Sequence, residues 1–333
     1  MRHVIRRILF YICAVWVAIT LDFFIPRLAP GDPVAALMGK MSTKGYVTPL
    51  MQQTLSAMFG LNTHDPLWLQ YFKYLGNLLH GNLGVSIQYF PTPVAALIQQ
   101  DIGWSIMLGA VAVIISFALG CLFGIITAWK RGSALDTFLS PAMNFLSAIP
   151  YFWLALFTLF IFAYSLNWFP LTGGGYDAAN LNPGWTIDFI SSAIQYAVLP
   201  ALTLVISSLA GWMLTMRNSM ITTLSEDYVL MAKAKGLSEG RVMFRYAARN
   251  AVLPNITGFA IAIGAIVGGQ LLTEMVFSYP GIGYALLQAV QQQDYAMVQG
   301  VFLIITLVVL GANFFADMLY AFLDPRVRVE RSA

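Results

Sequence analysis

Charged residues are scarce in this chain. Only 10% of its 333 residues are Asp, Glu, Lys or Arg, whereas 59% are hydrophobic. Soluble globular domains have about a quarter of their residues charged. The shortage excludes an ordinary water-soluble domain and indicates that much of the folded chain faces lipid.

Cysteine and histidine are equally rare. Cys13 and Cys121 both fall inside apolar runs, as small packing residues do. His3, His64 and His80 are dispersed and have none of the spacings of a metal site. The sequence therefore predicts neither a disulfide framework nor a bound metal.

Motifs for nucleotide binding and for zinc-dependent hydrolysis are missing as well. The chain contains no G-x-x-x-x-G-K-[ST] or H-E-x-x-H sequence. No acidic or basic residue lies at the centre of an apolar run, since Asp22, Glu274 and Asp317 all lie near run ends. This argues against a proton relay or a voltage sensor. We expect no cofactor and no enzyme activity, so any driving force must come from another chain.

Long apolar runs are what the chain has in abundance. A membrane-spanning helix needs roughly 20 predominantly apolar residues, and six runs qualify, at 8–25, 104–129, 141–166, 196–216, 254–277 and 298–322. Their length predicts an all-α polytopic membrane protein with six transmembrane helices. The first run, which follows MRHVIRR, lacks a cleavage site at its edge and is interpreted as a retained anchor.

Glycine and proline refine this prediction. Gly120 and Gly124 have the small-xxx-small spacing that lets two membrane helices approach closely. Pro150 and Pro200 are expected to bend or to start helices.

The loops give the orientation, because Lys and Arg concentrate on the cytoplasmic side of membrane proteins. With both termini in the cytoplasm, fourteen of the 18 basic residues are cytoplasmic, and the four others all lie in the long loop after the first run. The loops near 167–195 and 278–297 contain none. We therefore expect a multi-pass protein of the cell membrane with both termini inside. The net charge of +3 reflects this topology and does not indicate nucleic acid.

The long loop at 26–103 is predicted to contain helices. TPLMQQTLSAMFGL (48–61) and DPLWLQYFKYLGNLL (65–79) both have apolar residues at helical spacing. In the second segment these are Trp68, Phe72, Leu75 and Leu79. Two interpretations remain open: a lid or docking ledge on the outer face, and a cap that packs on the helix bundle or on the lipid interface.

One segment between the fourth and fifth runs collects eight charged residues, EDYVLMAKAKGLSEGRVMFRYAARN (226–250). Acidic residues at its start and lysines six to nine residues later suit the two ends of a helix. Gly236 suits the stop of that helix, and Ser238 can cap a second helix that carries Arg241, Arg245 and Arg249 on one stripe. The segment predicts a helix–turn–helix docking element, since simple membrane anchoring requires only charge.

The same segment resembles the coupling segment of ABC-importer permeases of the dipeptide/oligopeptide class. Ala232 and Gly236 match the Ala and Gly of that family's motif, Leu230 stands at the place of its Glu, and Tyr246 stands where many relatives have His. Four other segments are also similar to family sequences, at 27–37, 81–86, 274–283 and 317–328. The similarity thus covers essentially the whole chain.

The resemblance implies a type I ABC-importer permease fold. It implies three kinds of partner besides membrane lipid: a second homologous permease subunit, two ATP-binding subunits and an extracytoplasmic solute-binding protein. It also implies that the ATP-binding subunits are contacted through Tyr228, Met231, Ala232, Lys235, Gly236, Leu237, Arg245 and Tyr246.

This interpretation divides the chain into an N-terminal span with its outer loop (1–103), a five-span core (104–322) that contains the coupling segment (222–252), and a tail (323–333). Peptides are the first choice of substrate. Oligosaccharides, nickel complexes and glutathione remain open as alternative substrates. A passive channel or a secondary transporter is a less favoured alternative to the permease role.

Overall fold

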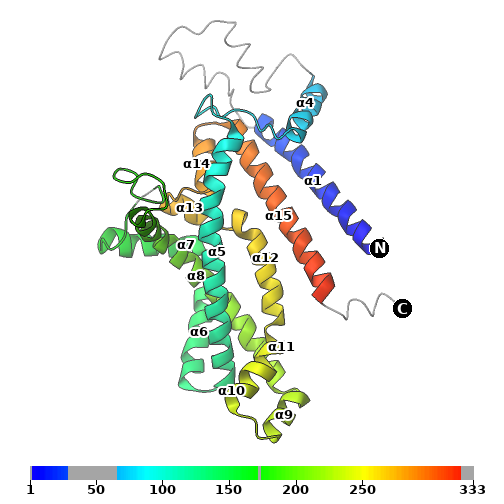
Figure 1. The fold of residues 1–333 in the computed structure, drawn as a ribbon, viewed down its shortest axis with the longest axis vertical. Helices are drawn as coiled ribbons and strands as arrows, with labels where there is room; N and C mark the ends of the chain where they lie inside the picture. The colour runs from blue at the N-terminus through cyan, green and yellow to red at the C-terminus, as the bar shows by residue number, and fades with distance from the viewer. Residues whose placement is uncertain (1, 29–65, 172–173, 324–333) are drawn as a thin grey trace. The chain divides into compact units, whose positions relative to one another are not determined.

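The computed structural model describes residues 2–28, 66–171 and 174–323. Within these ranges every regular element is a helix, and the only strand-like pairing is an isolated bridge between Val85 and Pro93 (Figure 1). The predicted all-α class is confirmed.

Four helices are each long and apolar enough to cross a membrane. They are α1 (Arg2–Leu28), α5 (Val94–Trp129), α8 (Ile187–Leu224) and α15 (Tyr295–Leu323).

Two further apolar stretches are helix pairs with a bend. The first pairs α6 (Ala134–Ala148) with α7 (Tyr151–Thr158), which continues as the π-helix η1 (Leu159–Ser165), and its bend is 99°. The second pairs α12 (Leu253–Gly269) with α13 (Leu271–Phe277), and its bend is 53°. The described residues therefore contain four to six spans, and six if each bent pair is one span.

The third predicted span differs most from the structure. It was expected as one helix over 141–166, but the chain turns sharply at Pro150, which precedes α7. A proline disfavours helical geometry in the residue before it, and Ile149 is extended. α6 also begins earlier than expected, because Ser133 caps it and Pro141 is tolerated inside it. The other proline, Pro200, lies inside α8.

α5 and α8 are longer than their predicted spans. They have 36 and 38 residues, which at about 1.5 Å per residue gives more than 50 Å. A bilayer core is about 30 Å thick, so both helices extend beyond it. Hydropathy marks only the part of a helix that matches lipid, which is why the polar ends were missed.

The chain folds as two compact units, and each is described by itself. One comprises residues 1–105 and 280–314 and includes α1, α4 (Leu67–Leu79), α14 (Ile282–Gln291) and most of α15. Helix α4 confirms the prediction at 65–79, whereas the predicted helix at 48–61 lies outside the described residues.

A buried carboxylate organises one end of this first unit. Asp294, just before α15, accepts hydrogen bonds from the backbone N–H of Gln88 (3.0 Å) and of Met297 (3.2 Å), and from the Ser86 hydroxyl. Nearby, a Cβ at Gly300 would lie 2.5 Å from Val94, so α15 and α5 touch there. These contacts fix the 80–93 loop to the start of α15.

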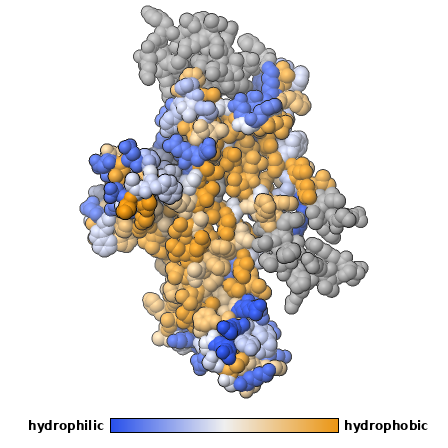
Figure 2. Space-filling model, viewed as in Figure 1, coloured by the Kyte–Doolittle hydropathy of each residue, from blue (hydrophilic) through white to orange (hydrophobic). Residues whose placement is uncertain are grey.

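The second unit comprises residues 106–279 and 315–333. In it α5 and α8 cross closely, because a Cβ at Gly120 would lie 2.5 Å from the Trp212 Cβ and one at Gly124 would lie 2.6 Å from the Met216 Cβ. The predicted close packing at these glycines is confirmed. Hydrophobic side chains cover these helices, and hydrophilic ones gather at the end that carries α9 and α10 (Figure 2).

Candidate functional site

The charged segment 226–250 forms a helix–turn–helix between α8 and α12. Its first arm is α9 (Asp227–Ala234), as predicted. The second arm contains α10 (Glu239–Arg241), the π-helix η2 (Val242–Ala248) and α11 (Arg249–Ala251). Ser238 stands at the N-cap position, but its side chain makes no capping hydrogen bond, so that detail of the prediction was wrong. We call residues 226–252 the hairpin.

Hydrogen bonds at the end of α9 set the sharp turn of the hairpin. Gly236 has a φ of +73°, a left-handed conformation that costs glycine little. Its N–H donates to the Lys233 carbonyl (2.9 Å), and the Leu237 N–H donates to the Ala232 carbonyl (3.4 Å). This pair of bonds is the Schellman motif, which ends a helix and satisfies its last carbonyls. The glycine stop was thus predictable from sequence.

The inner face of the hairpin is a hydrophobic core. Val229 and Ala232 are fully or almost fully buried, and Leu237 packs against the same cluster. The other buried members come from α5, α8 and the second arm: Cys121, Ile125, Ala128, Met216, Met220, Val242, Ala247, Ala248 and Ala251. The hairpin is therefore fixed to the ends of two long helices, and Ala232 is among the residues that fix it.

The outer face of α9 is also apolar but is not covered. Leu230 and Met231 are 49% and 57% exposed, and they turn away from the buried Val229 and Ala232. Tyr228 and Tyr246 are also exposed, and the Tyr228 hydroxyl accepts a hydrogen bond from Asn250 Nδ2 (2.8 Å).

The hairpin carries five exposed cations and three exposed acidic residues, which are Glu226, Asp227 and Glu239. Lys233 lies with its Nζ 5.4 Å from the centre of the Trp129 ring, within cation–π range. The other exposed cations of the hairpin are Lys235, Arg241, Arg245 and Arg249. Of the eight residues predicted as a docking site, six thus lie exposed, Leu237 is half-buried and Ala232 lies in the core.

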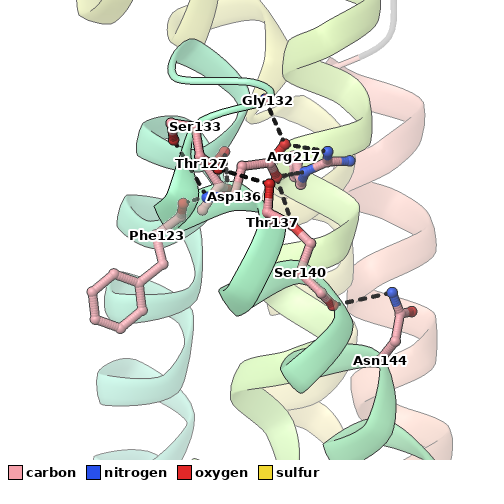
Figure 3. Close-up of polar contacts among 10 residues, drawn as sticks. Phe123, Thr127, Gly132, Ser133, Asp136, Thr137, Ser140, Asn144 and Arg217 are labelled. Carbon is pink, nitrogen blue, oxygen red and sulfur yellow. Dashed lines mark hydrogen bonds and ion pairs between the residues drawn. The ribbon is translucent and has the colours of Figure 1, made fainter.

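An ion pair at this end of the second unit joins α6 to α8. Asp136 Oδ1 and Oδ2 accept from Arg217 Nε (2.7 Å) and Nη2 (3.0 Å), as Figure 3 shows. Asp136 also accepts from the Ser140 hydroxyl (2.7 Å) and from the Gly132 N–H (3.1 Å). The side chains are 19% exposed for Arg217 and 8% for Asp136. The pair thus joins α8, which leads into the hairpin, to the start of α6.

Sequence reasoning missed this pair because it assigned both residues to loops. One pattern could have located Asp136. Ser133 and Asp136 form the S-x-x-D start of a helix, and the Asp136 N–H donates to the Ser133 hydroxyl (3.4 Å). The partner, Arg217, lies 81 residues away in sequence, and no local pattern links the two.

Among the described residues, no group of three or more His, Cys, Asp or Glu side chains could hold a metal ion. The hairpin instead offers an apolar surface that is firmly held by the buried cluster and lies outside the apolar spans.

Comparison with known proteins identifies the family. Residues 120–329 match the family described as binding-protein-dependent transport system inner membrane component. The chain belongs to this family, which confirms the expected transport subunit.

Curated relatives match over almost their whole length. The oligopeptide transport system permease protein AppB of Bacillus subtilis is 33% identical, with 98% of both chains covered. The di/tripeptide transport system permease protein DppB of Pseudomonas aeruginosa is 36% identical, covering 93% of this chain and 94% of its own. The dipeptide transport system permease protein DppB of Escherichia coli K12 is 33% identical, covering 98% and 99%.

Proposed function

We propose that this chain is a transmembrane permease subunit of an ATP-driven importer that translocates peptides. Relatives at 33–36% identity are named as permeases for oligopeptides, dipeptides and tripeptides, which favours peptides over the sugar, nickel and glutathione alternatives. A second permease subunit, two ATP-binding subunits and a solute-binding protein complete the importer. The span and outer loop at 1–103, the core at 104–322 and the tail at 323–333 are its functional parts.

The observation that carries the proposal is the apolar outer face of α9. Leu230 and Met231 are exposed although the hairpin lies outside the apolar spans. Exposed apolar side chains on a firmly held element mark a protein contact. We assign this face to an ATP-binding subunit, with Tyr228, Lys235, Gly236, Arg245 and Tyr246 at its edges. Ala232 and Leu237 hold the face in place from inside.

The docking test replaces the two exposed apolar side chains. Leu230→Gln with Met231→Gln keeps helix propensity and removes apolarity, so the protein should insert and accumulate normally. Copurification of the ATP-binding subunit should fall at least tenfold, and peptide uptake into vesicles should stop. Arg249→Ala is the control, because an exposed charge contributes about 1 kcal/mol at most. Unchanged copurification by the double variant would disprove docking at this face.

The proposed orientation places the hairpin and both termini in the cytoplasm, on the basis of the basic residues. Single cysteines at Ser133, Ser238 or Ser332 should react with an impermeant thiol reagent only after the membrane is permeabilised. Cysteines at Gly174 or Gln292 should react in intact spheroplasts. If the impermeant reagent labels the cysteine at position 238 in intact spheroplasts, the hairpin lies outside the cell, and the proposed orientation is wrong.

The substrate is tested through the solute-binding protein that copurifies with the complex. We expect mass spectrometry to find short peptides in its site. A sugar, a nickel complex or glutathione there would leave the permease role intact and replace the substrate.

A further inference from the structure

Helix α4 has a second apolar stripe that the fold leaves open. Trp68, Phe72 and Leu79 are 64%, 62% and 87% exposed, and with the half-buried Leu75 they recur every three or four residues. Such residues lie along one side of a helix. The polar residues Gln70, Lys73 and Asn77 lie on the other side by the same spacing. The helix is thus amphipathic, and its exposed apolar side faces away from the protein.

A third side of α4 attaches it to α1. The Phe23 ring of α1 packs against Tyr71 and Tyr74, with centroids 5.2 and 5.5 Å apart. The Tyr74 hydroxyl donates to Asp22 Oδ2 (2.9 Å), and the Tyr71 hydroxyl is 2.7 Å from the Thr20 hydroxyl. Figure 1 shows α4 beside this end of α1. Two ring contacts and two hydrogen bonds therefore hold α4 at a defined place.

That place is the end of a membrane span. The apolar span of α1 runs from Arg6 to Phe24, 19 residues, which is about 28 Å and matches the bilayer core. Thr20, Asp22 and Phe23 lie among the last five residues of this span. Because Tyr71 and Tyr74 are one turn apart on α4 and both contact Phe23, this stretch of α4 lies at the depth where acyl chains meet headgroups.

We propose that α4 lies in the interfacial layer of the membrane, with the Trp68, Phe72 and Leu79 stripe inserted among the lipids. At the same end of α1, Leu21 and Phe24 are also exposed apolar side chains. Trp and Tyr concentrate at membrane interfaces, and amphipathic helices bind there by their apolar side. This inference concerns one end of α1 and does not depend on the proposed function.

The placement gives α4 a mechanical role. A helix held both by lipid and by α1 fixes the depth of the span end and of the 80–93 loop that follows it. That loop is tied by Ser86 and Gln88 to Asp294. The interfacial helix therefore supports this loop at a constant height above the acyl chains.

The test uses the full chain in vesicles of phosphatidylethanolamine and phosphatidylglycerol. A Cys13→Ala background leaves only the buried Cys121. Phe72→Cys and Trp68→Cys receive an environment-sensitive fluorophore, and Asn77→Cys on the polar side is the matched control. Doxyl-labelled phosphatidylcholine in the bilayer should quench the label at 68 and 72 at least twice as strongly as at 77, and aqueous iodide should show the opposite order.

Two results would overturn the proposal. Equal iodide quenching at 72 and 77 would mean that the stripe faces water, as a ledge above the membrane. Protection of the label at 72 from both quenchers would mean that a protein partner covers the stripe. If Phe72→Cys alone fails to accumulate, Trp68→Cys reports on the same stripe.

Discussion

Removing either member of the Asp136–Arg217 pair should destabilise the protein strongly. Each side chain has given up most of its hydration, since only 8% and 19% of their surfaces remain exposed. Breaking a buried pair from one side leaves a charge without its counterion, which costs about 3–5 kcal/mol. We expect this range for Asp136→Asn. Arg217→Gln should lie at its lower end, because Asp136 keeps its bonds from Gly132 and Ser140.

The double variant separates the pair from its parts. With both charges removed no charge is stranded, so Asp136→Asn with Arg217→Gln should cost less than the sum of the single changes, by about 2 kcal/mol. Coupling energies of 0.5–3 kcal/mol are usual for residues in one network. The control is Arg241→Gln, an exposed cation of the hairpin, which should change stability by less than about 1 kcal/mol.

Unfolding is measured by titration with sodium dodecyl sulfate in mixed micelles, followed by circular dichroism. Single variants within about 1 kcal/mol of the unaltered protein would show that water screens the pair. If the loss of stability in the double variant equals the sum of the losses in the two single variants, the two residues act separately. Either result would refute the view that this ion pair stabilises the packing of α6 against α8.

Two further predictions concern glycines. Gly124→Ala should destabilise the protein by about 1–3 kcal/mol, because its Cβ would lie 2.6 Å from the Met216 Cβ and 2.7 Å from the Met213 carbonyl. The control, Gly211→Ala, has open space around it and should be nearly neutral in the same titration. Gly236→Val should strain the turn at φ +73° by about 1–2 kcal/mol, whereas Gly236→Asn should be tolerated, because asparagine visits this conformation. Gly236→Val should also reduce copurification of the ATP-binding subunit more than Gly236→Asn does. If both variants reduce copurification equally, the size of the side chain at position 236 matters and the backbone conformation does not.

The predictable features of the fold are those with a local cause. The long apolar runs, the helix at 65–79 and the stop at Gly236 each follow from residues close together in sequence, and all three appear in the structure. The close approach at Gly120 and Gly124 was also predictable, because a missing side chain is itself a local feature.

The features that sequence reasoning missed depend on distant residues or on competition between rules. Pro150 ends α6, whereas Pro141 and Pro200 are tolerated inside helices, and only the tertiary surroundings decide between these outcomes. The contact between Ser86 and Asp294 joins residues 208 apart. The sequence does not distinguish an Ala232 that is buried in the hairpin from an Ala232 that contacts a partner, because both roles favour a small side chain.

The burial of Ala232 changes how the hairpin motif is understood. A small residue here lets α9 lie against the second arm, and the turn at Gly236 sets the direction of that second arm. The matched Ala and Gly thus build the hairpin, and we propose that contact with a partner falls to Leu230 and Met231, which are exposed. It follows that enlarging Ala232 should act through stability, and that only changes on the outer face should separate a stable permease from its ATP-binding subunit. The Leu230 and Met231 variants in the docking test rest on this division between inner and outer faces.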